Sequence, residues 1–152
     1  MASDIQQIEV LLDGMYAMVS GPAGPRDWSR QYDVFHPLCR QIRTGCDEQG
    51  HAWFKMFDPE QYRTDADTIF ARQAFYEVET RREIRIFGNM AHVWSAYEAR
   101  TDLSDPQPER RGINSIQLYR DSALGWRVIS MIWDNERPGL PLEDGFPETP
   151  AA

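Results

Sequence analysis

The sequence is short of cysteine, of basic residues and of long apolar runs. Its two cysteines, Cys39 and Cys46, are too few for the disulfide framework of a small secreted domain. We expect reduced thiols, with a Cys39–Cys46 bridge as the alternative. No apolar run approaches the ~18 residues that a membrane-spanning helix needs. The opening residues, MASDIQQIEV, lack the basic and apolar regions of a secretory signal, so we expect a cytoplasmic protein.

Positive charge is also scarce, with 16 Lys and Arg against 24 Asp and Glu and a net charge of −8. Proteins that bind nucleic acid usually present a basic stripe to phosphate. The densest basic stretch here, Arg81, Arg82 and Arg85, lies inside an otherwise acidic segment. The balance argues against nucleic acid and against an anionic membrane surface as partners.

Residues that hold cofactors are sparse as well. The three histidines, His36, His51 and His92, are scattered and show no paired-ligand spacing with the cysteines. The glycine-containing stretch 21–25 lacks the lysine and the preceding strand of a phosphate-binding loop. We therefore expect no cofactor and no metal.

Three stretches predict helices near the N-terminus. Ser3 and Gln6 have capping-box spacing, and the helix that they begin should end at Gly21-Pro22. Asp27 is placed to begin a short second helix, which should end before Pro37. Asp58-Pro59 is a strong helix start, with the helix running to about residue 72.

The remainder of the chain predicts a sheet. Gly88-Asn89 is the turn of a two-residue hairpin between two of the strands. Residues 44–51 are expected to form a loop, and residues 52–57 are ambiguous between strand and irregular structure. The expected strands are 38–43, 75–87, 90–100, 111–120 and 126–135. Helices followed by a long antiparallel sheet give an α+β class.

One domain accounts for this pattern. The chain has 152 residues, which is the size of a single domain. We place the domain at residues 1–137. Residues 138–152, rich in proline and acidic residues, should form an exposed C-terminal tail.

Both faces of the predicted sheet carry apolar residues. An antiparallel sheet with one wet face shows a clean apolar–polar alternation, which strands 90–100 and 126–135 lack. The N-terminal helices can cover one face only. A symmetric homodimer is the common cover for the other. We expect its interface to contain Val93, Tyr97, Val128 and Ile132.

Three segments, in this order and spacing, resemble the nuclear transport factor 2-like superfamily. Residues 26–40 resemble its second helix and first strand, 87–93 its central hairpin, and 125–131 its closing Gly-Trp-Arg strand. The superfamily includes ketosteroid isomerases, scytalone dehydratases, limonene epoxide hydrolases, polyketide cyclases and non-catalytic binding proteins. The resemblance implies a cystatin-like cone, in which a curved antiparallel sheet wraps around the N-terminal helices. It also implies an apolar pocket inside the cone and a dimer formed through the outer face.

The same resemblance implies which residues face the pocket. Tyr16 or Met15 would close it from the first helix, and Trp94 and Trp133 would form flat walls for a ring-shaped ligand. On strand 111–120, a shift of one residue would replace Ser115 and Gln117 by Asn114. The inward-facing set is His92, Trp94, Ala96, Glu98, Ser115, Gln117, Met131, Trp133 and Asn135.

The chemistry of this pocket stays open. The carboxylate base of a ketosteroid isomerase would fall at or beside Arg43, which cannot take a proton. His92 with Glu98 and Tyr16 could form a reduced acid–base set, although a lone histidine on a sheet is usually structural and Glu98 could simply pair with Arg100. A pocket that binds an apolar cyclic molecule is the first hypothesis. The alternatives are a cofactor-free lyase or isomerase using His92 and Glu98, and an interaction module whose cavity its own side chains fill.

Overall fold

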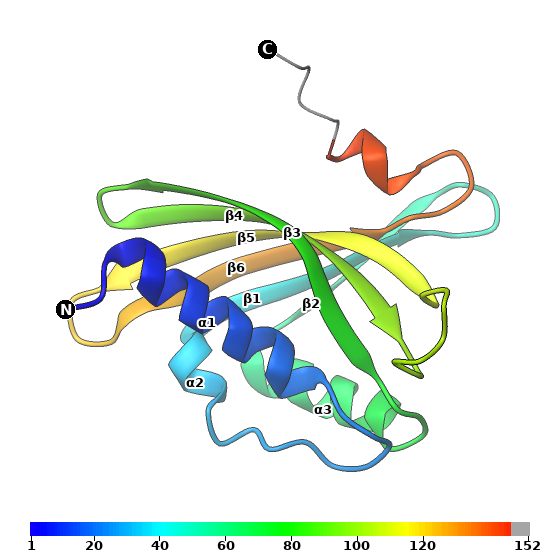
Figure 1. Ribbon diagram of the computed structural model, residues 1–152, viewed down its shortest axis with the longest axis horizontal. Coiled ribbons are helices and arrows are strands. Elements are labelled where there is room, and N and C mark those ends of the chain that lie inside the picture. The colour runs from blue at the N-terminus through cyan, green and yellow to red at the C-terminus, as the bar shows by residue number, and fades with distance from the viewer. Residues whose placement is uncertain (147–152) are drawn as a thin grey trace.

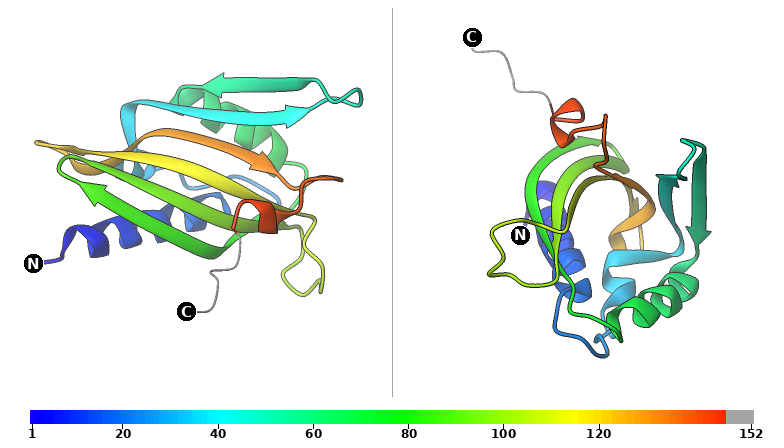
Figure 2. Two further views of the ribbon diagram at one scale, coloured as in Figure 1. Left: turned by 90° about the horizontal axis from the view of Figure 1, so that it is seen from above. Right: turned by 90° about the vertical axis from the view of Figure 1, so that its right-hand side faces the viewer.

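A curved six-stranded sheet wraps around three helices in the structure, a computed structural model that describes residues 1–146 (Figure 1). These three helices lie on the hollow side of the sheet, here called the concave face (Figure 2). Residues 138–146, here called the C-terminal segment, lie on the outer, convex face (Figure 2). The expected α+β class and cone shape are confirmed. The elements are α1 (Asp4–Val19), α2 (Gln31–Val34), β1 (Phe35–Cys46), β2 (Ala52–Phe57), α3 (Pro59–Phe70), β3 (Tyr76–Phe87), β4 (Met90–Arg100), β5 (Arg110–Asp121), β6 (Gly125–Asn135) and the 3-10 helix η1 (Leu142–Asp144).

The two long helices begin where the sequence predicts. The Ser3 hydroxyl accepts the Gln6 N–H at 3.2 Å, and the Gln6 side chain accepts the Ser3 N–H at 2.9 Å. Asp58 and Gln61 repeat this capping box at α3, with proline as its first residue. Such caps satisfy N–H groups that have no partner inside a helix. The second helix is shorter than expected, because β1 begins directly after it at Phe35.

The strands follow the order β2-β1-β6-β5-β4-β3. Gly88 makes the predicted β3–β4 turn with φ +59°, in the left-handed region that favours glycine. Residues 44–46, expected in a loop, extend β1, and residues 52–57 form β2, which pairs with residues 41–46. The sheet is mixed rather than wholly antiparallel, because β1 runs parallel to β6, with Gln41 opposite Met131.

The main core lies between the concave face and α1, and it fixes which way each strand faces. In β4 the buried, inward residues are Ala91, Val93, Ser95, Tyr97 and Ala99. The sequence prediction had these residues facing outward and was therefore wrong for this strand. Both faces of β4 are rich in apolar groups, so alternation alone did not specify the inward one.

The expected dimer interface needs the same correction. Val93, Tyr97 and Val128 are at most 4% exposed and belong to the core, whereas Ile132 is 40% exposed on the convex face. Strand β6 holds both kinds of residue because Ile129 is an extra residue between two register positions paired with β5. A bulge of this kind reverses the alternation along a strand.

Residues 138–146 fold back over the convex face, although the sequence predicted an exposed tail for them. The Trp94 indole N–H donates to the Gly145 carbonyl at 2.9 Å, and the buried Phe146 ring lies 6.4 Å from the Trp94 ring, centroid to centroid. The backbone N–H of Leu142 donates to the Glu136 carboxylate at 2.7 Å. The rest of the expected tail, residues 147–152, lies outside the described residues.

Neither cysteine forms a disulfide. Cys39 and Cys46 are free thiols, and burial raises the pKa of the Cys39 thiol to about 12. Within residues 1–146, none of the helices combines the length and the hydropathy needed to cross a bilayer.

Candidate functional site

A cavity of about 270 Å³ lies between α3 and the concave face of the sheet. Apolar and polar groups contribute about equally to its wall, and in sites that bind small molecules such polar groups fix the orientation of the ligand. The apolar lining consists of Tyr62, Ala66, Ile69, Phe70, Phe75, Met131 and Trp133. The polar lining consists of Arg43, Glu77, Tyr97, Arg110, Asn114 and Asn135.

Glu77 contributes a carboxyl group to this cavity from the start of β3. The strand is held there by α1, because the Ser20 hydroxyl accepts the Glu77 N–H at 3.0 Å. The Asn114 amide N–H is the one donor to the carboxylate within residues 1–146, at a long 3.4 Å. Burial raises the pKa of Glu77 to about 7, against the opposing effects of Asn114 and the positive charge of Arg110. This carboxyl group can therefore both donate and accept a proton near neutral pH.

A buried network of hydrogen bonds supports Asn114 from behind. Asn114 donates to the Tyr16 hydroxyl at 3.0 Å, and the Tyr16 and Ser95 hydroxyls lie 2.6 Å apart. Ser95 donates in turn to the Glu79 carboxylate at 2.5 Å, which also accepts from Arg82. The network joins α1, β3, β4 and β5, so the amide that meets Glu77 is fixed by four elements of the fold.

Two further groups shape the opposite side of the cavity. Arg43 donates to the Asp65 carboxylate at 2.9 Å, and its guanidinium carbon lies 5.8 Å from the centroid of the Trp133 ring. The Tyr97 hydroxyl donates to Asn135 at 2.5 Å. Burial raises the pKa of Tyr97 well above its usual range, so this phenol stays a neutral donor.

The predicted pocket residues divide between the two faces of the sheet. Met131, Trp133 and Asn135 line the cavity, and a role in ligand binding stays a prediction. Trp94 and Ser115 instead line a hollow of about 440 Å³ beneath the C-terminal segment on the convex face, which Trp133 and Asn135 also border. His92 and Gln117 also lie on that face, farther along the sheet. Ala96 shares their side of β4 and is buried.

The three residues of the predicted acid–base set are not brought together. His92 Nε2 lies 3.1 Å from the Ser115 hydroxyl, and Glu98 is paired with Arg100 at 2.8 Å. Tyr16 is in the core, on the other side of the sheet from both. A catalytic role for any of them stays a prediction.

Sequence reasoning missed Glu77, Tyr97 and Arg110. Glu77 stands among alternating acidic residues that are typical of a solvated strand, and only the packing of α3 shows that it faces an enclosed space. One pattern could have indicated the inward orientation of Glu77. Strand alternation places Glu77 on the same face as the aromatic residue Phe75, and an aromatic residue usually faces the interior.

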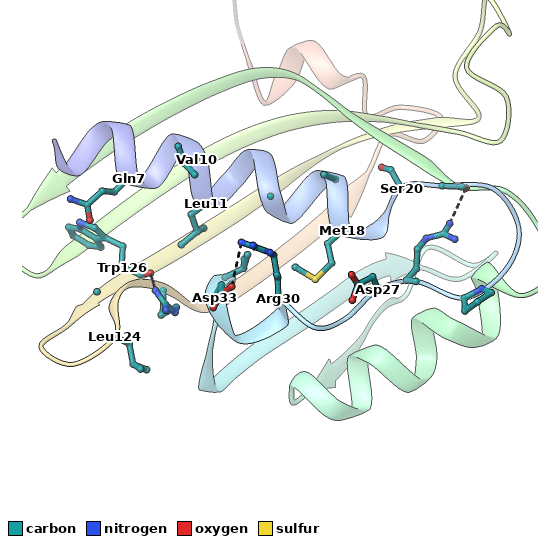
Figure 3. A pocket seen from close by; sticks show the side chains of 18 of the residues that line it. Gln7, Val10, Leu11, Met18, Ser20, Asp27, Arg30, Asp33, Leu124 and Trp126 are labelled. Atoms are coloured by element: carbon teal, nitrogen blue, oxygen red, sulfur yellow. Dashed lines mark hydrogen bonds and ion pairs between the residues drawn. The ribbon is translucent and has the colours of Figure 1, made fainter. Parts of the chain in front are cut away.

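A second and larger hollow, of about 670 Å³, is an open groove between α1, the loop that follows it and the β5–β6 turn (Figure 3). Its charged side chains already have partners. Arg26 donates to the carbonyl groups of Val19 and Gly21 at 2.9 and 3.0 Å, and Arg30 lies 3.9 Å from Asp33. The inner cavity is the better candidate site, because its polar groups have unused hydrogen-bonding capacity. In the described part of the chain, no three His, Cys, Asp or Glu side chains are grouped closely enough to bind a metal ion.

No protein-family model and no curated protein matches the sequence. Several solved structures resemble the fold. A Nostoc punctiforme protein of unknown function with a cystatin-like fold matches with a TM-score of 0.68 and 14% identity over 93% of this chain and 97% of that one. A nuclear transport factor 2-like superfamily protein from Salmonella enterica matches with a TM-score of 0.66 and 14% identity over 88% and 92%.

A third structure, the CaMKII hub of S. rosetta, matches with a TM-score of 0.56 and 12% identity over 87% of this chain and 93% of that one. Identities this low establish an architecture and leave activity open. The chain has the cystatin-like fold of the nuclear transport factor 2-like proteins, as its sequence resemblance predicts.

Proposed function

We propose that the protein binds a small, mainly apolar cyclic molecule in the cavity between α3 and the concave face. The supporting observation is the composition of the wall, where aromatic rings enclose a space that also holds Glu77, Asn114 and Asn135. A cavity of about 270 Å³ has room for roughly nine non-hydrogen atoms, at ~30 Å³ for each water-sized group. That is the size of one substituted ring. The open cavity also argues against an interaction module whose interior is filled.

Binding of a neutral ring tests this proposal. Benzyl alcohol should shift the NMR signal of the Trp133 indole, because this ring forms part of the wall. Ala66 is a buried cavity residue on α3, and Ala66→Leu should reduce the affinity at least tenfold by filling the space.

The matched control for this test is Ala17→Leu, an exposed position on α1 that lines only the outer groove. It should bind benzyl alcohol as the wild type does. Absence of binding by the wild type at millimolar concentration, or equal binding by the Ala66 variant, would refute the proposal.

A cofactor-free isomerase or lyase is the second candidate, and the position of Glu77 favours it. A carboxyl group with a pKa of about 7 inside a small cavity suits proton transfer at neutral pH. Glu77 would remove a proton from the carbon beside a ring ketone, leaving an enolate with its charge on the oxygen. Return of the proton to another carbon would complete an isomerisation. In this role Glu77 replaces the predicted pair His92 and Glu98.

Deuterium exchange into cyclohexanone in heavy water measures that step. The wild type should accelerate exchange above the buffer rate, and Glu77→Gln should abolish the acceleration. Glu98→Gln, on the convex face, serves as the control and should exchange like the wild type. Equal rates with and without the wild-type protein would exclude this candidate for simple ring ketones.

We also propose that the protein forms a homodimer through the convex face. Phe87 and Met90 are 79% and 61% exposed there, paired across the β3–β4 hairpin, with Tyr119 beside them on β5. Burial of such side chains stabilises an association at ~25 cal/mol per Å² of apolar area. Two of the solved structures that share this fold are a CaMKII hub and a protein described as a calmodulin-dependent kinase II association domain.

Light scattering at micromolar concentration tests the dimer. The wild type should have the mass of two chains, and Met90→Lys should have the mass of one. Val10→Lys, at an even more exposed apolar position on α1, should remain dimeric. A monomeric wild type would remove this proposal.

A further inference from the structure

Arg110 is the least engaged charged group of the cavity. It is the first residue of β5, and strand alternation places it on the concave face with Asn114. Its guanidinium carbon lies 5.9 Å from the centroid of the Phe75 ring. Within residues 1–146 its side chain makes no ion pair and donates no hydrogen bond. Its neighbour Arg111, on the opposite face, donates twice to Glu136, at 3.0 and 2.6 Å.

The other charges of the cavity leave the positive charge of Arg110 unbalanced. Arg43 is neutralised by Asp65, 2.9 Å away. Glu77 is near enough to Arg110 for its pKa to be lowered by it, but burial outweighs this effect and keeps the carboxyl protonated up to about pH 7. Below that pH Arg110, an exposed residue that lines the cavity, carries a positive charge with no ion-pair partner among residues 1–146, so its guanidinium is free to meet an anion that enters from solvent.

We infer that the molecule bound in this cavity is a single-ring carboxylic acid, held by Arg110 through its carboxylate. The inference rests on the proposed binding function and names the class of ligand. A guanidinium group presents parallel N–H donors that match the two oxygens of a carboxylate, and its plane suits a planar partner. A six-membered ring with one carboxylate has nine non-hydrogen atoms, which agrees with the volume of the cavity.

The position of Glu77 makes such binding dependent on pH. A carboxylate on Arg110 would face a second carboxylate if Glu77 were ionised, and two like charges at close range disfavour each other. The other titratable groups that face Glu77 are Tyr16 on α1, Tyr62 on α3 and Tyr97 on β4. Burial raises the pKa of all three phenols, so they remain neutral and Glu77 alone changes charge between pH 6 and pH 8. Above about pH 7, where Glu77 is ionised in the free protein, binding of the acid should therefore be accompanied by the uptake of about one proton.

Benzoate and benzamide are matched probes, because they have the same shape and differ in charge. Calorimetry with the full chain should show benzoate binding at least tenfold more tightly than benzamide at pH 6. From pH 6 to pH 8 the benzoate affinity should fall about tenfold, as expected for a group with a pKa of about 7 that must be protonated. The benzamide affinity should not change.

Three variants separate the role of Arg110 in binding the carboxylate from the role of Glu77 in the pH dependence. Arg110→Gln should reduce the ratio of benzoate to benzamide affinity to about one. Arg111→Gln is the control on the other face and should keep the ratio. Glu77→Gln should retain benzoate binding and lose its pH dependence.

The outcomes distinguish this inference from the proposed function. If benzamide and benzyl alcohol bind but benzoate has no advantage, or if its advantage survives in Arg110→Gln, the acid ligand is refuted and the cavity remains a site for neutral rings. Benzoate affinity that is equal at pH 6 and pH 8 would refute the proton uptake. If none of the three molecules binds, the proposed function itself fails.

Discussion

Replacing Glu77 by Gln should stabilise the folded protein at alkaline pH. The substitution keeps the size of the side chain and an oxygen that can still accept from Asn114, but it removes the carboxyl group that burial makes costly to ionise. The folded pKa lies above the unfolded value of about 4.5. Between these two values the folded state holds more protons than the unfolded state, so wild-type stability falls as pH rises from 4.5 to 7 and levels off above that.

The size of this stabilisation follows from the rise in the pKa of Glu77 on folding. One pKa unit corresponds to about 1.4 kcal/mol, so a rise from 4.5 to about 7 costs the wild type about 3 kcal/mol at most at pH 8. Glu77→Gln avoids this cost. With a urea dependence of roughly 2 kcal/mol per molar, its unfolding midpoint at pH 8 should lie about 1.5 M above that of the wild type. At pH 5 the wild type has lost only about 0.8 kcal/mol by the same linkage, so the difference in midpoint should shrink to about 0.4 M.

Urea unfolding followed by tryptophan fluorescence measures both midpoints. Taking the difference between variant and wild type cancels every other group that titrates in the same range. Glu83→Gln is the matched control, because Glu83 lies on the same strand with its side chain 51% exposed, and its midpoint should follow the wild type at both pH values. A difference between Glu77→Gln and wild type that is the same at pH 5 and pH 8 would show that the Glu77 carboxyl group is not shifted.

Four other substitutions test the packing by urea unfolding. Gln41→Met should stabilise the fold by about 1 kcal/mol, because neither amide atom of the buried Gln41 has a partner within residues 1–146. Gln31→Met should destabilise it by about 1–3 kcal/mol, because it removes the 2.8 Å hydrogen bond from the Gln31 amide to the Pro59 carbonyl. Tyr16→Phe should cost about 1–3 kcal/mol by leaving its buried partners unsatisfied. Gly112→Ala should cost more than about 2 kcal/mol, since a Cβ there would lie 2.6 Å from a backbone oxygen as well as against Tyr97. A change of opposite sign in any of the four would contradict the packing described.

Local signals predicted the elements well, because their causes are local. Ser3 and Asp58 begin helices through bonds to residues three positions away, and Gly88 turns the chain through its own backbone conformation. The resemblance to the nuclear transport factor 2-like superfamily then predicted how the helices and the curved sheet are arranged in space. The pairing of β1 with β6 came from neither composition nor periodicity, since the two strands are far apart along the chain.

The candidate site was predicted only in part, and the reason is geometric. Trp133 was expected in the cavity and lies there, while Trp94, expected opposite it, faces the C-terminal segment. A single extra residue in a strand reverses every side chain beyond it, and Ile129 and Thr80 are such residues. Neither residue is of a type that identifies a bulge from the sequence. The inward orientation of Glu77 is likewise a consequence of tertiary packing.

The neighbouring positions of β1 and β6 have a consequence for how the chain is made. Strand β1 is synthesised early, but its partner β6 leaves the ribosome about eighty residues later. Until then one edge of the β1–β2 hairpin has free N–H and C=O groups, which another nascent chain could pair with. The sheet cannot close until almost the whole sequence has been synthesised. Contacts between residues far apart in the sequence also slow folding. Truncated or stalled chains that end before residue 125 should therefore be prone to aggregation, although they contain every helix of the cone.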